Sequence, residues 1–253
     1  MDFALRGKKA LVTGASGNLG GAIATALALQ GVSVALLYGS LTSQSRTEQL
    51  AERLACLDGV EAIALLGDVR DEQVLEASIE ACKAQFGSLD FVINNAGIFT
   101  NSTQADLTED AWDAVMDINV KGIWRVCRLT LPLLAETKGC VVNISSINAF
   151  RPGFGGTAHY DASKGAVASY TRSLAKEYAP LGVRVNAVAP GLIDAIKLRE
   201  HAPDLVEAYE QRAALHQLIK PEEIATIVCF LCSAGSKAMT GEIVTADGGY
   251  GMM

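Results

Sequence analysis

The sequence predicts a doubly wound α/β fold, in which helices cover both faces of a seven-stranded parallel sheet. Short apolar runs rich in β-branched residues alternate with longer segments of helical periodicity, a pattern typical of such sheets. A glycine-rich stretch also follows the first run and opens directly into a predicted helix. The chain has 253 residues, half of them hydrophobic, and no linker-like or repetitive segment. We therefore expect a single domain over residues 1–253.

Each predicted strand is a short apolar run, and each predicted helix lies between two runs or after the sixth. In a sheet of this kind ligands bind beyond the carboxyl ends of the strands, so functional residues should follow strands directly. The helix over 109–134 contains Pro132 and should kink or end there. The predicted strands are 9–13, 33–38, 62–66, 91–94, 140–144, 184–189 and 242–245, and the predicted helices are 20–30, 46–57, 72–86, 109–134, 162–178, 204–215 and 221–232.

Charge and composition exclude several classes of protein. The formal net charge of −7 argues against nucleic acid or an anionic membrane as the main partner. No apolar run approaches the ~20 residues of a membrane span, and residues 1–9 carry charges where a signal peptide is apolar. Cys229 and Cys232 lie in an apolar helical stretch, which favours buried thiols over a redox or zinc pair. The three histidines lack metal-ligand spacing. We expect a reduced, soluble, cytoplasmic protein without a metal.

The glycine-rich stretch has the features of a pyrophosphate site. A strand, a glycine-rich turn and a helix N-terminus present bare backbone amides and the positive end of the helix dipole to an anion. Such turns also serve close packing between a strand and a helix, so the stretch alone does not decide between the two. It reads Thr13-Gly14-Ala15-Ser16-Gly17-Asn18-Leu19-Gly20.

Tyr160 and Lys164 form the most informative pair in the chain. Their spacing of four places the phenol and the ammonium on one helix face, about 5–6 Å apart at Cβ. A nearby cation favours the phenolate and lowers the tyrosine pKa from its usual ~10, which suits proton transfer at neutral pH. The alternative is an amphipathic tyrosine beside a solvated lysine.

Further motifs follow the remaining strands in order. They are Gly67-Asp68-Val69, Asn94-Asn95-Ala96-Gly97, Asn119, Ser145-Ser146, Pro190-Gly191, Thr240-Gly241 and Asp247-Gly248-Gly249. With the glycine-rich turn and the Tyr160–Lys164 pair, this ordered set resembles the single-domain branch of the short-chain dehydrogenase/reductase family, and the resemblance runs essentially end to end. It implies a Rossmann-like fold and an NAD(P)-dependent oxidoreductase acting on CH–OH and C=O groups.

The resemblance assigns roles to the matching residues. Tyr160 would be the general acid in reduction and the base in oxidation, while Lys164 lowers its pKa and holds the nicotinamide ribose. Ser146 would orient the carbonyl oxygen, and Asn119 would anchor a water that links Lys164 to solvent. The hydride chemistry belongs to the cofactor. The implied cofactor-binding residues are Gly14, Ser16, Gly17, Asn18, Leu19, Gly20, Tyr38, Ser40, Asp68, Val69, Asn95, Ala96, Gly97, Tyr160, Lys164, Pro190, Gly191 and Ile193.

Three positions depart from the family pattern. Asn18 occupies a glycine slot and Gly17 precedes it, a spacing commoner in the longer, epimerase-like branch; asparagine tolerates left-handed φ, so the turn should survive. Ala195 replaces a threonine that contacts the carboxamide, which leaves the backbone of Ile193 to serve. Ser146 precedes Tyr160 by fourteen residues rather than thirteen, so the 149–156 loop is one residue longer, and Ser145 is the fallback.

The end of the second predicted strand favours NADP(H) over NAD(H). NAD-selective sites place an acid there for the ribose hydroxyls, but this slot is Tyr38. The basic residue that some NADP enzymes carry in the turn is also absent, because that slot is Gly17. Polar residues after Tyr38 either contact a 2′-phosphate or merely cap the next helix; they are Ser40, Thr42, Ser43 and Arg46.

Loop residues indicate an apolar substrate cleft. Its expected border is Phe99, Phe150, Phe154, Leu192, Ile196 and Leu198, and its expected substrate contacts are Ser146, Phe99, Phe154, His159 and Leu192. His159 has a structural role as its alternative. Residues 194–216 should form a substrate lid.

Several functions fit this cleft. The leading hypothesis is an NADP(H)-dependent reductase of a small ketone or aldehyde. The alternatives are a 3-oxoacyl thioester reductase, an NAD-dependent sugar or polyol dehydrogenase and, outside the enzymes, a nucleotide-sensing regulator. Near the cleft mouth lie Lys138 but also Leu181, which together with the acidic charge favours a free small molecule over a carrier protein. The resemblance and the apolar tail 250–253 imply a homo-tetramer or homo-dimer.

Overall fold

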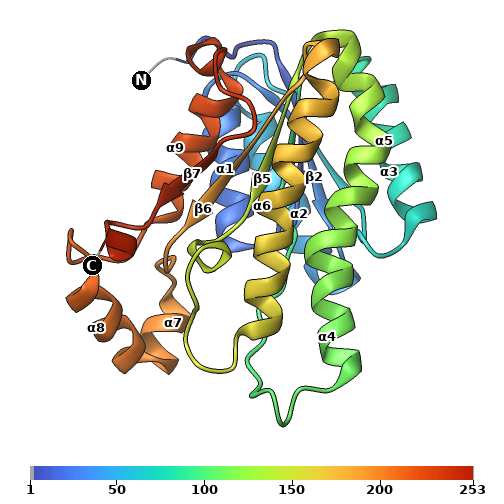
Figure 1. Cartoon of the computed structure of the whole chain (residues 1–253). Helices are drawn as coiled ribbons and strands as arrows, with labels where there is room; N and C mark the ends of the chain where they lie inside the picture. The colour runs from blue at the N-terminus through green and yellow to red at the C-terminus, as the bar shows by residue number, and fades with distance from the viewer. Residues whose placement is uncertain (1–2, 253) are drawn as a thin grey trace.

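The computed structural model describes residues 3–252 and contains one parallel sheet of seven strands in the order β3-β2-β1-β4-β5-β6-β7 (Figure 1). The doubly wound prediction is confirmed, with the switch point between β1 and β4. Five strands have the predicted bounds, β6 ends one residue later and β7 is shifted by one. The strands are β1 Lys9–Thr13, β2 Ser33–Tyr38, β3 Ala62–Leu66, β4 Phe91–Asn94, β5 Cys140–Ile144, β6 Arg184–Pro190 and β7 Ile243–Ala246.

Helices cover both faces of the sheet. Successive residues of each strand point to opposite faces, so Val12 of β1 packs with helices α1, α2 and α9, whereas Leu11 packs with α3, α5 and α6. The α-helices are α1 Asn18–Leu29, α2 Gln44–Ala55, α3 Glu72–Phe86, α4 Glu109–Met116, α5 Gly122–Thr137, α6 Ala158–Tyr178, α7 Ile196–His201, α8 Pro203–Arg212 and α9 Pro221–Cys232. None of the helices among residues 3–252 has the length and apolar character that a membrane crossing requires.

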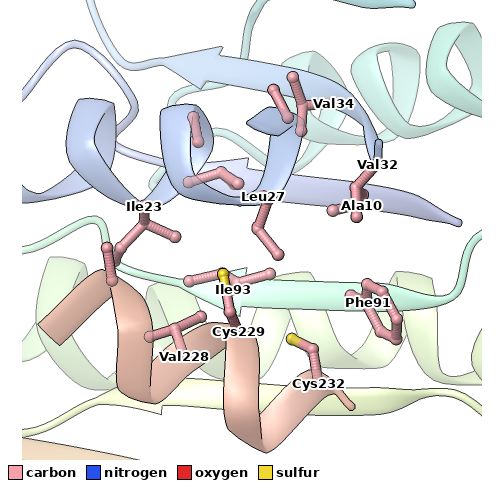
Figure 2. Packing of buried hydrophobic residues seen from close by; sticks show 14 of the residues in the cluster. Ala10, Ile23, Leu27, Val32, Val34, Phe91, Ile93, Val228, Cys229 and Cys232 are labelled. Atoms are coloured by element: carbon pink, nitrogen blue, oxygen red, sulfur yellow. The ribbon is translucent and has the colours of Figure 1, made fainter. Parts of the chain in front are cut away.

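The core on the first face of the sheet packs α1 against α9. Ile23 and Leu27 of α1 and Val228 of α9 belong to one cluster with Ile93 of β4 (Figure 2). Cys229 and Cys232 are free, buried thiols in this core, as predicted. Because this core fixes α1 against the end of β1, it also fixes the glycine-rich turn between them.

The long predicted helix is interrupted, but not at its proline. A π-helical turn over Asp117–Lys121 separates α4 from α5, and α5 continues through Pro132 to Thr137. The proline removes the hydrogen bond to the carbonyl of Arg128. Arg128 and Pro132 are both exposed, so water can solvate that carbonyl and the helix persists. The prediction that the helix ends at Pro132 is therefore wrong.

Four helices begin earlier than predicted: α1 and α2 by two residues, α8 by one and α6 by four. Because α6 begins at Ala158, Tyr160 lies in its first turn. The predicted lid contains α7, which the sequence reading did not foresee, as well as α8.

Candidate active site

The glycine-rich turn joins β1 to α1 through very close backbone contacts. Thr13 Oγ1 accepts hydrogen bonds from the backbone amides of Asn95 (3.0 Å) and Ala96 (2.9 Å), which ties β1 to the end of β4. Asn95 Nδ2 donates to the carbonyls of Thr13 (3.0 Å) and Gly14 (3.1 Å). A Cβ on Gly20 would lie 2.6 Å from Asn95 Nδ2. The turn, Asn95 and α1 thus pack so closely that only glycine fits at position 20.

The N-terminus of α1 is left open to an anion. Gly17 is the N-cap residue and has no side chain with which to cap the first-turn amides, and that turn carries no acidic residue. The first amides of a helix need acceptors, and the positive end of the helix dipole favours an anionic one. The predicted residues Ser16, Gly17 and Asn18 also line a groove of about 430 Å³ at this end of α1. The turn therefore fits the pyrophosphate of a dinucleotide.

Asn18 keeps the turn intact for a different reason from the one predicted. It is the first residue of α1 and has helical geometry, so its tolerance of left-handed φ is not used. Its side chain instead donates from Nδ2 to the carbonyl of Asp194, at 3.1 Å. Asn18 therefore links the glycine-rich turn to the segment after β6, where the predicted lid begins.

Predicted cofactor-binding residues also lie after β2 and β3. Tyr38 is buried at the end of β2, and Ser40 Oγ lies 2.8 Å from Thr42 Oγ1 and 3.0 Å from Ser43 Oγ. After β3, Asp68 forms an ion pair with Arg70 (2.7 Å), and this hydrogen bond is the main cause that lowers the pKa of the Asp68 carboxyl. Val69 follows Asp68 and is buried beneath the π-helical turn.

Tyr160 and Lys164 point from α6 toward the ends of β5 and β6. Lys164 is 5% exposed, and its ammonium donates to the carbonyl of Ile144 (2.9 Å) and lies 5.6 Å from the Tyr160 ring centre. Both side chains line a cavity of about 180 Å³ together with the predicted cofactor residues Asn95, Gly97 and Ile193. The same cavity is lined by Leu19, Pro190 and Gly191, so the structure brings the turn, the β4 end and the β6 end to one place.

The pKa of the tyrosine does not follow the prediction. Burial raises the pKa of Tyr160 to about 12, against a lowering effect from its hydrogen bond with Ser146. Burial also lowers the pKa of Lys164 to about 8. The predicted lowering of the Tyr160 pKa is wrong for this structure, because desolvation of the phenol has the largest effect. Tyr160 is therefore a neutral phenol, and thus a proton donor, at neutral pH.

The two serines after β5 have different partners. Ser145 Oγ donates to the backbone carbonyl of Lys164 (3.1 Å) and is thus turned toward α6. Ser146 accepts from the amide of Asn148 (3.2 Å) and lines both the small cavity and a second, larger one. Of the two, Ser146 is the hydroxyl placed next to the Tyr160 phenol.

Asn119 is fully buried in the π-helical turn. Its side chain accepts from the amide of Ile98 (2.8 Å) and donates to the Ile98 carbonyl (3.0 Å) and to Ser163 Oγ (3.1 Å). π-Helical turns often mark functional sites, and this one fixes the segment after β4 against α6. The anchoring of a water by Asn119 stays a prediction.

A larger cavity of about 370 Å³ adjoins Tyr160 and Ser146 and is mostly apolar. The predicted substrate contacts Phe99, Phe154 and Leu192 line it, and Phe99 packs edge-on against Tyr160, with 5.0 Å between ring centres. Of the other predicted border residues only Leu198 lines it; the side chains of Phe150 and Ile196 are exposed elsewhere.

His159 is not brought into this cavity. Its imidazole is fully buried, Nε2 lies 2.6 Å from Thr100 Oγ1, and it is absent from the cavity lining. His159 therefore has the structural role that was named as its alternative. The predicted contact with the substrate is corrected, because the imidazole is buried away from the cavity.

The sequence reading missed one wall of the cavity. Tyr209 of α8 and Tyr250 of the C-terminal segment stack face to face, with ring centres 4.5 Å apart, and both line the cavity. Tyr209 donates to the carbonyl of Asp247 (2.8 Å), which ties α8 to the segment after β7. The remaining residues of the lining that were not predicted are Ile147, Asn148, Arg151, Pro152, Gly153 and Leu205.

The predicted lid region begins with an ordered backbone. Ile193 pairs with Ile219, and the flanking Asp194 amide donates to the Ile219 carbonyl (2.8 Å). Ile193 lines both cavities, and within residues 3–252 its amide donates to no other backbone group. Ala195 offers only a methyl group, and binding of the cofactor by the backbone of Ile193 stays a prediction.

Comparisons with known proteins agree with this geometry. A family model described as enoyl-(acyl carrier protein) reductase matches residues 14–251. A Staphylococcus aureus protein named 3-oxoacyl-(acyl-carrier-protein) reductase FabG is 36% identical over 246 residues, which is 97% of this chain and 98% of the relative.

Solved structures are similar over the same length. A dehydrogenase/reductase from Sinorhizobium meliloti superposes with a TM-score of 0.92 at 33% identity, over 98% of this chain and 97% of that one. A short chain dehydrogenase from Burkholderia cenocepacia in complex with NADP superposes with a TM-score of 0.91 at 34% identity, over 98% and 99%. With the convergence of Ser146, Tyr160 and Lys164 beside the glycine-rich turn, these matches place the chain in the short-chain dehydrogenase/reductase family of oxidoreductases.

Proposed function

We propose that the chain reduces the carbonyl group of a small ketone or aldehyde with NADPH, and oxidises the corresponding alcohol in reverse. One observation carries the proposal: Ser146 and Tyr160 line both the small cavity, which the predicted cofactor residues enclose, and the larger apolar cavity. A carbonyl group at the junction would meet a hydroxyl and a phenol on one side and a nicotinamide on the other.

The residues at the junction have complementary tasks. The nicotinamide, when bound, supplies the hydride to the carbonyl carbon. Tyr160, whose pKa is raised to about 12, is a neutral phenol and donates its proton to the carbonyl oxygen. Ser146 stabilises the charge that grows on the same oxygen. Lys164, held on the Ile144 carbonyl, stabilises the tyrosinate that remains. Asn119 positions the segment after β4 against α6.

The residues after β2 support NADP(H) over NAD(H). The hydroxyls of Thr42 and Ser43 both lie within hydrogen-bonding distance of the Ser40 hydroxyl. Arg46 lines the groove beside the glycine-rich turn. Hydroxyls and a guanidinium are donors that suit a 2′-phosphate. The Burkholderia cenocepacia relative was crystallised with NADP. The remaining predicted contacts, from Gly14 through Ile193, surround the dinucleotide in this proposal.

The lid and the oligomer are part of the same proposal. Residues 194–216 cover the substrate, and Asn18 couples the start of this lid to the nucleotide turn through the Asp194 carbonyl. Trp112 and Trp124 expose large apolar surfaces on α4 and α5, 38% and 41% of each residue. Exposed aromatic side chains of this size favour an interface, here with further copies of the chain in a homo-tetramer or homo-dimer.

A second candidate is reduction of a 3-oxoacyl thioester. The observation that favours it is the 36% identity, across nearly the whole chain, with the Staphylococcus aureus protein named 3-oxoacyl-(acyl-carrier-protein) reductase FabG. The apolar cavity would accept an acyl chain as readily as a free ketone.

The test is NADPH oxidation against a panel of ketones, aldehydes and 3-oxoacyl thioesters, followed by identification of the alcohol product. NADH replaces NADPH in a parallel set. Reduction of free ketones or aldehydes that is faster with NADPH supports the leading proposal, and reduction of thioesters alone supports the second. No reduction in either set, with NADPH bound, contradicts both.

A further inference from the structure

The larger cavity contains one formal charge in an otherwise neutral wall. Among the residues that line it, only Arg151 is charged at neutral pH; the wall is otherwise aromatic, aliphatic or uncharged polar. The chain as a whole has a net charge of −7, so a cavity with one cation and no carboxylate among its lining residues differs from the rest of the molecule. A substrate that fills such a cavity is apolar over most of its length and meets a cation at one point.

Arg151 has no carboxylate partner among residues 3–252. No ion pair or hydrogen bond is recorded for its guanidinium in that part of the chain. The carboxylate of Asp247 borders the same outer hollow of about 540 Å³ as Arg151. Its two oxygens accept from the backbone amides of Gly249 (3.0 Å) and Gly251 (2.7 Å), so the tail segment holds this carboxylate. The five guanidinium donors of Arg151 are therefore available to a ligand.

The loop that carries Arg151 is anchored on both sides of it by one side chain. Asp161, next to Tyr160 on α6, accepts from Asn148 Nδ2 (2.6 Å) and from the Gly153 amide (3.0 Å). It also accepts from Thr157 Oγ1 (3.1 Å) at the far end of the loop. The longer loop is thus held in one arrangement relative to Tyr160. An arginine that is positioned before the ligand arrives binds it with less loss of conformational entropy.

We propose that the preferred substrate is an apolar ketone that ends in a carboxylate, and that Arg151 binds this carboxylate while the carbonyl lies at Tyr160 and Ser146. The inference rests on the proposed reductase function and adds the substrate class. The hydride would leave a C–H bond of the dihydronicotinamide with its electron pair, which oxidises NADPH to NADP⁺, and would form a new C–H bond at the carbonyl carbon. The electrons of the C=O π bond move to oxygen, which takes the Tyr160 proton. The carboxylate itself is unchanged and only fixes the position of the ketone.

The test compares keto acids with their neutral counterparts. The probes are 4-oxopentanoate, 5-oxohexanoate and 7-oxooctanoate, each beside its methyl ester, with NADPH as the reductant. We expect one acid length to exceed its ester in kcat/KM by roughly 10- to 100-fold, the range for a hydrogen bond to a charged group. In Arg151→Gln that ratio should collapse to within about threefold of unity, by the same estimate, and Arg151→Lys should restore part of it.

The matched control is Lys83→Gln. Lys83 is an exposed cation on α3, and its removal changes the net charge by the same amount as the Arg151 variant. The Lys83→Gln variant should leave the ratio of kcat/KM for the acid to kcat/KM for its ester unchanged. Thermal denaturation of each variant checks that the fold is retained.

Each outcome bears on the inference separately from the proposed function. If ketones are reduced but acids and esters are equal, or the ratio persists in Arg151→Gln, the inference is wrong and the reductase proposal stands. If Arg151→Gln slows only the reduction of acetoacetyl-coenzyme A, the anion that Arg151 binds is a phosphate of the coenzyme A moiety. The assignment of a carboxylate is then overturned. If no probe, ester or thioester is reduced, the proposed function itself fails.

Discussion

Two adjacent glycines of α1 offer a direct test of how tightly the nucleotide turn is packed. A Cβ at Gly20 would lie 2.6 Å from Asn95 Nδ2 and 3.0 Å from Ala15 Cα, and closer still to the Gly14 carbonyl oxygen. A Cβ at Gly21 would make ordinary contacts, 3.5 Å from the Ala15 carbonyl oxygen and 3.7 Å from Leu50 Cδ2. Both positions are helical, so alanine gains the same roughly 1 kcal/mol of helix propensity at each.

The two alanine variants should therefore change stability in opposite directions. Two of the three nearest atoms at position 20 belong to the backbone and can move only if the turn shifts, so overpacking there should cost about 3 kcal/mol, the upper end of the usual range. Gly20→Ala should then lose about 2 kcal/mol net, which lowers Tm by about 4–8 °C for a chain of this size. Gly21→Ala should gain up to about 1 kcal/mol, or about 2–4 °C.

Thermal denaturation and an NADPH titration by fluorescence are the assays for this pair. Gly20→Ala should also bind NADPH more weakly, because the Gly14 carbonyl and Asn95 must shift with the turn. Equal Tm values and equal NADPH affinities for Gly20→Ala and the wild type would refute the close packing of the turn.

Three further variants test other parts of the site. Burial lowers the pKa of Lys164 from 10.5 to about 8, so the unfolded state binds more protons between these values and the free energy of unfolding rises with pH across that window. Chemical denaturation at pH 7 and pH 9.5 should show that the free energy of unfolding of the wild type increases relative to that of Lys164→Met, and a constant difference would contradict the shift. Asp161→Asn should raise KM more than it lowers kcat, because the loop loses a charged hydrogen-bond acceptor worth about 1.5–3 kcal/mol per bond; steady-state kinetics measure the two constants, and an unchanged KM would count against the anchor. Ser40→Asp should lower kcat/KM for NADPH by at least about tenfold and spare NADH, since a carboxylate repels a 2′-phosphate; equal losses with both nucleotides would argue against a 2′-phosphate at this position.

Most of the strands could be predicted from the sequence because β1, β2, β4, β5 and β6 are buried on both faces. Runs such as Val34–Leu37 and Val141–Val142 are uninterrupted by polar residues, and they have only one stable place in a layered α/β fold. The motifs that follow the strands were found for the same reason: parallel strands end at one edge of the sheet, so residues far apart in sequence meet there.

Helix boundaries depended on features that periodicity does not carry. The π-helical turn at Asp117–Lys121 continues the apolar pattern of α4 into α5, so a helical pattern alone runs through it. Pro132 was expected to break α5, but its unpaired carbonyl partner is on the exposed side of the helix. The first outcome goes with the buried hydrogen bonds of Asn119 and the second with solvent access at Arg128, and both follow from the packed structure rather than from the local sequence.

The positions of the candidate site residues were predicted better than the electrostatics around them. The spacing of Tyr160 and Lys164 placed both side chains correctly, but the direction of the tyrosine pKa depends on how deeply the phenol is buried. Tyr209 and Tyr250 could not be paired from the sequence, because 40 intervening residues return the chain from α8 to the end of β7. The sequence shows Arg151 as a lone cation in an apolar loop, which is a signal for a special role. That Arg151 lines the cavity could be seen only from the folded structure.

The measurement that tests the central claim most directly is the turnover of Tyr160→Phe with NADPH and the best ketone found for the wild type, beside its NADPH dissociation constant. The variant lacks only the hydroxyl that is proposed to donate the proton. The account predicts a loss of at least about 10²-fold in kcat, the lower limit usual for a general acid, with NADPH affinity within about threefold of the wild type. A kcat close to that of the wild type would show that another group supplies the proton and would contradict the assignment of Tyr160.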